Sequence, residues 1–269
     1  LDILPVQARV YEQAGKFPQA QESLSKLLEI QQKLKASPID IARTKSALAL
    51  PMLEQGDVAS AEPLLNDALK TLSDAPEDEK RGLSHVYYGL SKIAVSRGDY
   101  NKATDYLQQA ILRKSKVSGA TDPDLVQFWQ DLGEVYLVQG KLSDSEEALG
   151  KVLKIADMRF GKDSAQAADA YKDFATVYFQ KGQLGKSEAF FKKSLAIKSK
   201  DFGADSVSAA EVMAAMAMLY TREQKYKQAE PLFQQALEIR TRELGADSPQ
   251  AKRTKELYAT LQKRMKGSK

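Results

Sequence analysis

Apolar residues recur along this chain at the spacing of amphipathic helices, and the whole pattern repeats every 42 residues. In each unit, large apolar side chains stand four residues apart, which returns them to one face of a helix. These pairs are Leu24 and Leu28, Leu65 and Leu69, Leu107 and Ile111, Leu149 and Leu153, Phe191 and Leu195, and Phe233 and Leu237. A second apolar stretch precedes each of them and places bulk beside a small residue, as in Leu132-Gly133. Each unit is therefore predicted to be a pair of packed helices.

Turn residues divide the units at regular positions. The turn between the two helices of a unit falls at Gly15, Gly56, Gly98, Gly140, Gly182 and Gln224. Glycine adopts the left-handed conformation that ends a helix at little cost. A second series ends the later helices at Gly119, Gly161, Gly203 and Gly245, and Ser164, Ser206 and Ser248 follow as N-caps. The pattern predicts six helix pairs and a final single helix over about 248–266, whose basic face is typical of a solubilising cap.

A constant period of this length is typical of a solenoid, in which each repeat packs only on its neighbours. We therefore expect an all-α fold and one solenoid domain over residues 1–269. An array of HEAT repeats has a similar period, but that family lacks the Gly-Lys-Tyr type of turn found here. Such an architecture favours a binding scaffold over an enzyme.

Two segments resemble a known repeat. Trp129-Gln-Asp-Leu132-Gly133-Glu-Val-Tyr136 resembles the first-helix signature of the tetratricopeptide repeat (TPR), and Ala229 with Phe233 resembles its second-helix signature. The longer unit is similar to the repeats of kinesin light chains. The resemblance implies a right-handed superhelical α-solenoid of about six helix-turn-helix repeats with a C-terminal capping helix. It also implies a concave groove, lined by the first helices, that binds peptides or proteins without catalysis or a cofactor.

The sequence departs from this family at the positions that hold a peptide backbone in kinesin light chains. An Asn-Asn pair on the first helix is replaced here by Gln130-Asp131, Lys172-Asp173 and Ala214-Ala215. The only two asparagines, Asn66 and Asn101, fall in second helices. We therefore expect neither the cargo recognition of kinesin light chains nor recognition of chaperone tails.

Composition excludes several classes of function. The chain is 43% apolar and 28% charged, which suits a continuous core under a solvated surface. Its formal charge of +4 is too small and too dispersed to predict nucleic-acid binding. The absence of cysteine excludes disulfides and thiolate metal sites, and a single histidine excludes a histidine-rich metal site. No apolar run approaches the ~20 residues of a membrane helix.

Some residues suggest chemistry, but we interpret them as structural. His85 is expected to be a solvated surface residue, and Trp129 a packing residue of its repeat. Four acids are expected on exposed helix faces, without a nucleophile or an apolar pocket that would shift their pKa values; they are Asp131, Glu134, Asp169 and Asp173. A solvated convex face is expected to hold Lys192, Lys193, Lys198 and Lys200. No catalytic, cofactor-binding or metal-binding residue is predicted.

The first-helix positions on the expected concave side define a candidate partner-binding groove. Its residues are His85, Tyr88, Lys92, Gln127, Gln130, Asp131, Glu134, Asp169, Lys172, Asp173, Thr176, Glu211 and Met218. The series has an acidic middle, in which only Lys172 is basic, and an apolar end around Met218. This order predicts a protein or peptide partner that is basic and carries a small hydrophobic anchor.

A second hypothesis stays open beside the adaptor. The repeats could be a structural, self-associating module cut from a larger signalling or enzyme protein. The chain begins at Leu1 rather than at methionine, which we interpret as a processed end or as the start of a fragment. A soluble protein is expected; a cytoplasmic location and an extracytoplasmic one after signal cleavage both fit.

Overall fold

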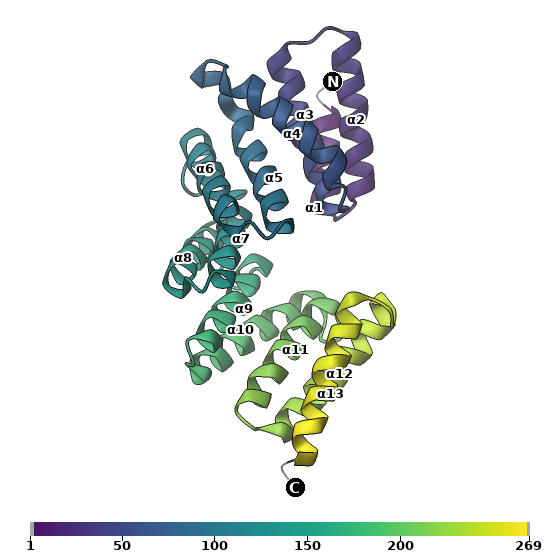
Figure 1. Cartoon of the computed structure of the whole chain (residues 1–269), viewed down its shortest axis with the longest axis vertical. Helices are drawn as coiled ribbons and strands as arrows, with labels where there is room; N and C mark the ends of the chain where they lie inside the picture. Colours follow the sequence, from purple (N-terminus) through teal and green to yellow (C-terminus); the bar gives the residue numbers. More distant parts are fainter. Residues whose placement is uncertain (1–2, 268–269) are drawn as a thin grey trace. The chain divides into compact units, whose positions relative to one another are not determined.

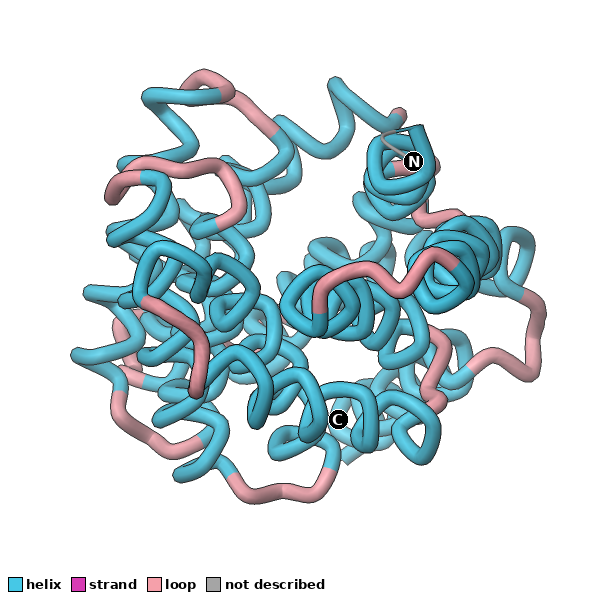
Figure 2. The backbone as a smooth tube through the Cα atoms, turned by 90° about the horizontal axis from the view of Figure 1, so that it is seen from above, coloured by secondary structure: helices cyan, strands magenta, loops and turns pink. Residues whose placement is uncertain are grey.

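The computed structural model describes residues 3–267, and every regular element within them is helical (Figures 1 and 2). Thirteen α-helices and one 3-10 helix follow one another, with no strand in this range. Helices α1 to α12 occur in the order and at the positions of the six predicted repeats, and α13 is the predicted terminal helix. None of the described helices is both long and apolar enough to span a bilayer. The predicted all-α repeat solenoid is confirmed.

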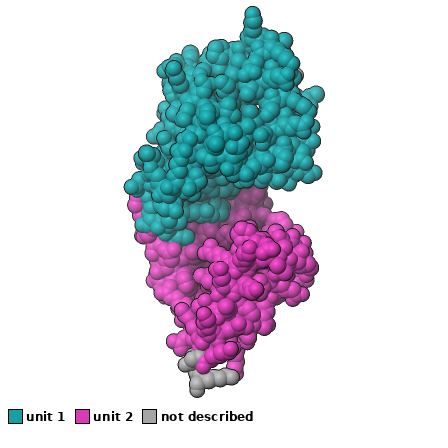
Figure 3. All heavy atoms as spheres, turned by 45° about the vertical axis from the view of Figure 1, so that its right-hand side comes forward, with its two compact units in different colours: residues 1–139 teal, residues 140–269 magenta. Residues whose placement is uncertain are grey.

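The chain divides into two compact units, residues 1–139 and 140–269 (Figure 3). The first unit contains α1 (Ile3–Gln13), α2 (Phe17–Lys33), α3 (Pro38–Glu54), α4 (Val58–Ser73), η1 (Glu77–Gly82), α5 (Leu83–Ser96), α6 (Tyr100–Ser118) and α7 (Leu125–Val138). The second contains α8 (Leu142–Arg159), α9 (Ala165–Gln180), α10 (Leu184–Phe202), α11 (Val207–Arg222), α12 (Tyr226–Leu244) and α13 (Pro249–Gly267). Odd-numbered helices are the first helices of their repeats, and even-numbered helices are the second.

The turn residues have the backbone conformation that the repeat predicts. The five turn glycines from Gly15 to Gly182 have φ between +67° and +81°. Gln224 takes φ +61° at the same place in the last pair, although it carries a side chain. The predicted N-caps are also present, since the Ser164 and Ser206 side chains accept hydrogen bonds from the amides of Ala167 and Ala209. These local interactions set where the helices of each unit begin and end.

The core of the first unit lies between its helix layers. Alanines and leucines of α4, such as Leu65 and Leu72, form a buried cluster with Leu83, Val86 and Leu90 of α5. Small residues let these helices approach closely, because the positions with bulk on one helix meet short side chains on the next. The helix η1 is not predicted by the repeat pattern. A side chain of another helix contacts its backbone: Arg43 donates a hydrogen bond from Nη2 to the Glu79 carbonyl at 2.8 Å.

The core of the second unit continues into the terminal helix. Met213 and Met216 of α11 are buried. Leu261 of α13 is fully buried in a cluster with Phe233 of α12 and Leu219 of α11. The exposed side of α13 carries basic side chains at Lys252, Arg253, Lys255, Lys263, Arg264 and Lys266. The helix therefore covers the apolar face of the last pair and presents a charged face to solvent, as a capping helix does.

Candidate partner-binding surfaces

A cavity of about 550 Å³ opens in the first unit between the first helices of its repeats. Most of its lining comes from α1, α3, α5 and α7. Those residues are Pro5, Ala8, Arg9, Glu12, Gln13, Ala47, Leu50, His85, Tyr88, Gln127 and Phe128, joined by Leu24, Lys114 and Asp124. The first helices therefore line a hollow in this unit, which is where the sequence places the groove.

An ion cluster joins the two ends of the first unit beside this cavity. Arg9 Nη2 of α1 lies 3.3 Å from Asp124 Oδ1 at the start of α7, although 115 residues separate them. Lys114 Nζ lies 2.5 Å from Asp124 and 3.4 Å from Asp122. Burial acts to raise the pKa of Asp124, but the hydrogen bond and charge of Lys114 outweigh it and hold that pKa below its usual value. The cations of this cluster are thus already paired with carboxylates.

His85 and Glu12 face the same hollow. His85 is half-buried, so the prediction of a solvated surface histidine is wrong. The α1 and α7 helices enclose its side of the cavity, and burial, reinforced by Lys114, lowers the pKa of its imidazole. Burial also raises the pKa of the Glu12 carboxyl from 4.5 to about 7, against the opposing charge of Arg9. No hydrogen bond or ion pair engages the Glu12 side chain among the described residues.

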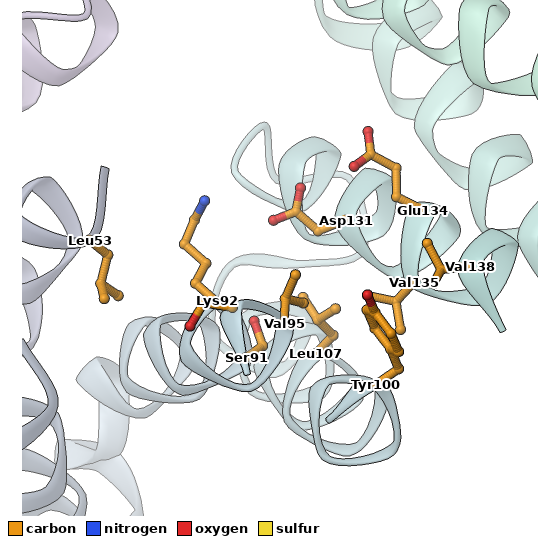
Figure 4. A pocket seen from close by; sticks show the side chains of 11 residues that line it. Leu53, Ser91, Lys92, Val95, Tyr100, Leu107, Asp131, Glu134, Val135 and Val138 are labelled. Carbon is orange, nitrogen blue, oxygen red and sulfur yellow. The ribbon is translucent and has the colours of Figure 1, made fainter. Parts of the chain in front are cut away.

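A second cavity of about 400 Å³ lies further along the same helices of the first unit (Figure 4). Lys92 of α5 and Asp131 and Glu134 of α7 border it, above an apolar floor that includes Val95 and Val135. Figure 4 shows the Lys92 amine and the two carboxylates extending from the helices into the same space. Lys92 Nζ lies 2.8 Å from Glu54, so the lysine that lines this cavity already has a carboxylate partner.

Tyr88, which lines the first cavity, is in contact with Asp131, which lines the second. The Tyr88 ring stacks on Phe128 with 4.4 Å between centroids, and its hydroxyl hydrogen-bonds to Asp131. Gln127 Nε2 donates to Asp131 Oδ1 at 2.6 Å. Asp131 is half-buried rather than exposed, and burial raises the pKa of its carboxyl although Lys92 opposes the shift. The same burial and the nearby Asp131 raise the pKa of Tyr88 well above its usual value.

In the second unit, the predicted groove acids take part in an ion network. Lys198 Nζ of α10 lies 2.7 Å from Asp169 and 3.4 Å from Glu211, and the residue is only 4% exposed. Lys172 Nζ lies 2.8 Å from Glu211 and 3.6 Å from Asp173. Burial alone would lower the pKa of Lys172, but Asp173 and Glu211 hold that pKa above its usual value. Two ammonium groups are thus paired with three carboxylates here.

The network corrects three predictions. Lys198 does not lie on a solvated convex face, because α10 turns it inward between the acids of α9 and α11. Lys172 is consequently not the only base among these acids. Asp173 is 5% exposed rather than on an exposed helix face, and its carboxylate is paired within the unit.

Of the other predicted groove residues, some are buried in the helix packing and some are exposed to solvent. Gln130 is 8% exposed and belongs to the packed side of α7. Glu134 is exposed, as expected, and Thr176 is half-buried with its hydroxyl donating to the Lys172 carbonyl at 3.1 Å. Met218 is 37% exposed and borders a third cavity of about 250 Å³ in the second unit. The sequence series therefore marks the first-helix surface but not which of its side chains are free to bind.

Comparison with known proteins places the chain among repeat proteins. A family model described as tetratricopeptide repeat matches residues 40–112, 125–200 and 208–268, and a second model of the same description matches residues 88–159. No curated protein matches the sequence.

Solved structures with similar folds share little sequence with this chain. BtubC (BKLC) from P. vanneervenii is 17% identical, with a TM-score of 0.65 over 90% of this chain and 92% of that one. A putative kinesin light chain repeat protein from Podosopora anserina is 21% identical, with a TM-score of 0.56 over 74% and 95%. The apo quorum sensor NprR from B. thuringiensis is 15% identical, with a TM-score of 0.72 over 97% and 72%. Because the family models cover most of the chain, with the predicted period and helix pairs, the protein belongs to the tetratricopeptide repeat family.

Proposed function

We propose that this protein is a non-catalytic scaffold that binds a basic peptide or protein segment on the first-helix surface of its first unit. The observation that carries the proposal is the pair of adjacent cavities, about 550 and 400 Å³, lined mainly by first helices. Hollows of this size with apolar floors and a few polar groups suit side chains of a partner. The similar fold of a quorum sensor agrees with a binding role.

Charge supports a basic partner. The cations that border the two cavities are Arg9, Lys92 and Lys114, and each already has a carboxylate partner. Glu12 has none among the described residues, although its pKa of about 7 leaves it only partly ionised near neutral pH, and the exposed Glu134 lines the second cavity. A lysine or arginine of a partner would therefore gain favourable contacts that an acidic side chain would not. Because Glu134 is exposed to solvent, its attraction for a basic partner acts mainly on association rate and register.

Selection from a library of random peptides on the purified chain tests this proposal. We expect the recovered peptides to be enriched in lysine and arginine, and their affinity to fall with added salt. Glu134→Lys should weaken binding about three- to tenfold. Asp105→Lys is the matched control, because Asp105 is exposed on the second helix α6 and lines neither cavity.

Two results would contradict the proposal. Recovered peptides without basic enrichment would remove the charge argument, and equal affinity for the Glu134→Lys and Asp105→Lys variants would place binding elsewhere. Sedimentation of the chain alone tests the alternative of a self-associating module. Concentration-dependent growth in mass, reversed by neither peptide nor salt, would favour that alternative.

A further inference from the structure

The third cavity differs in charge from those of the first unit. It measures about 250 Å³ and lies where α9, α11, α12 and α13 meet. Its lining consists of Phe179, Met218, Thr221, Arg222, Phe233, Leu257, Thr260 and Arg264. Two of these eight side chains are arginines and none is acidic. The two cavities of the first unit, in contrast, are bordered by carboxylates.

Arg222 is held in place without a carboxylate. Its guanidinium carbon lies 4.7 Å from the centroid of the Phe179 ring, and Nη1 donates to the Phe179 carbonyl at 2.9 Å. A guanidinium has five N–H donors, so these contacts orient the group and leave most of its donors unused. No ion pair of the described residues includes Arg222, and the residue is exposed. It is a fixed cation that faces an apolar hollow.

The remaining walls offer an apolar seat and no competing hydrogen-bond donor. Phe233 is buried at the base, and Met218 is 37% exposed at the rim. The hydroxyls of Thr221 and Thr260 donate to the carbonyls of Ala217 and Glu256 in their own helices, at 2.7 and 3.0 Å. The hydrogen-bond donors that remain available to a ligand are therefore those of the Arg222 guanidinium. A flexible thioether such as Met218 adapts to aliphatic side chains of different shape.

We propose that this cavity is a second binding site, which takes an internal protein segment carrying an aspartate or glutamate beside an aliphatic side chain. The aliphatic group occupies the hollow between Met218, Leu257 and Phe233. The carboxylate meets the Arg222 guanidinium, which is suited to a two-pronged contact with its oxygens, and the exposed Arg264 adds positive charge on α13. The site uses side chains of the second unit alone. The proposal is therefore independent of the proposed binding of a basic segment by the first unit.

The test uses random peptides displayed with both ends fused inside a carrier protein, so that only internal side chains are presented. Selection on the full chain should recover a class that combines acidic and aliphatic residues. Synthetic peptides of this class, with blocked ends, should bind the Arg222→Gln, Arg264→Gln double variant about tenfold or more weakly than the wild type. Their affinity should be unchanged in Glu134→Lys, which separates this site from the first-unit surface.

Two further variants keep the result interpretable. Lys255→Gln removes an exposed cation of α13 that does not line the cavity, and it should bind like the wild type. Arg222→Lys keeps the charge and should give an intermediate loss even if Arg222→Gln fails to fold. Unchanged affinity in the double variant, or recovery of no acidic and aliphatic class, overturns the proposal. Binding that requires a free C-terminal carboxylate also overturns it, because the ligand would then be a chain end.

Discussion

Lys198 Nζ lies 2.7 Å from an Asp169 carboxylate oxygen, and the lysine is one of the most buried charged residues of the chain, at 4% exposure. Its ammonium group also lies 3.4 Å from Glu211. A buried charge is stable only when its partners remain, because removing one of them leaves the other charge desolvated and unpaired. The two acids are partly exposed, at 41% and 44% of their side-chain surface, which moderates the energy at stake.

Replacing Lys198 with methionine should therefore destabilise the second unit by about 1–3 kcal/mol. The methionine retains the apolar stem of the lysine, so the loss reports mainly on the charge. Lys200→Met is the matched control, because Lys200 is exposed two residues later on the same helix, and it should change stability by less than about 0.5 kcal/mol. Urea unfolding followed by circular dichroism measures both. Equal losses in the two variants would mean that the network contributes no net stability.

Gly89 of α5 shows that a close helix contact can be tested with a single methyl group. A Cβ atom placed there would lie 2.7 Å from Leu65 Cδ1 and 2.9 Å from Cδ2 of the same fully buried leucine. Overpacking of this kind typically costs 1–3 kcal/mol, offset by up to about 1 kcal/mol from the better helix propensity of alanine. We expect Gly89→Ala to destabilise the first unit by about 1–2 kcal/mol in chemical unfolding.

Gly150→Ala is the control for this substitution. Gly150 is exposed in α8, and a Cβ atom there would have no neighbour within 4 Å. Only the propensity gain applies, so this variant should be more stable than the wild type by about 0.5–1 kcal/mol. Opposite signs for the two variants are expected. A stabilising Gly89→Ala would show that α4 and α5 separate easily.

These examples also show where sequence reasoning succeeds in this protein and where it ends. The turns, the caps and the recurring apolar positions are local properties of each repeat, so they predict the helix pairs and α13. The pairing of Arg9 with Asp124 spans 115 residues and depends on how successive repeats curve. That curvature cannot be predicted from a local sequence pattern. The same holds for Lys198. Its position in the repeat predicts on which face of the helix it lies, but not that acids of α9 and α11 cover it. The sequence therefore locates the first-helix surface, while the partners of its charges emerge only from packing.

Glu12 should make the stability of the first unit depend on pH. Burial raises the pKa of its carboxyl from 4.5 to about 7 in the folded chain, with Arg9 lowering it and Asp124 and Glu54 raising it further. The folded state thus keeps a proton that the unfolded state loses, so this contribution to stability falls as pH rises from about 4.5 to about 7. Between about pH 5 and about pH 8, the wild type should lose unfolding free energy on the order of 1–2 kcal/mol through this group. The Glu12→Gln variant should not show this loss.

Fluorescence of the single tryptophan, Trp129 in α7, reports urea unfolding of the first unit. His85 titrates in a neighbouring range with the opposite sign: burial lowers its pKa, so its contribution is lost as pH falls below its unfolded pKa of about 6.5. The contribution of His85 to the pH dependence is present in both proteins, so it cancels when Glu12→Gln is compared with the wild type. An identical pH dependence in the two proteins would show that Glu12 ionises normally.

Gln224 occupies the turn position that glycine holds in the other five repeats, with φ +61°. A side chain in this left-handed conformation costs about 1–2 kcal/mol, whereas glycine adopts it freely but loses about 0.4–1 kcal/mol more through the entropy of the unfolded chain. The balance favours Gln224→Gly by about 0.5–1 kcal/mol. Gly182→Gln should cost about the same amount, because Gly182 has φ +73° and no atom lies within 4 Å of an added Cβ. Both turns belong to the second unit, so denaturant midpoints followed by circular dichroism compare the two variants directly. If Gln224→Gly instead lowers the midpoint, the glutamine side chain must stabilise its turn by more than its backbone strain costs.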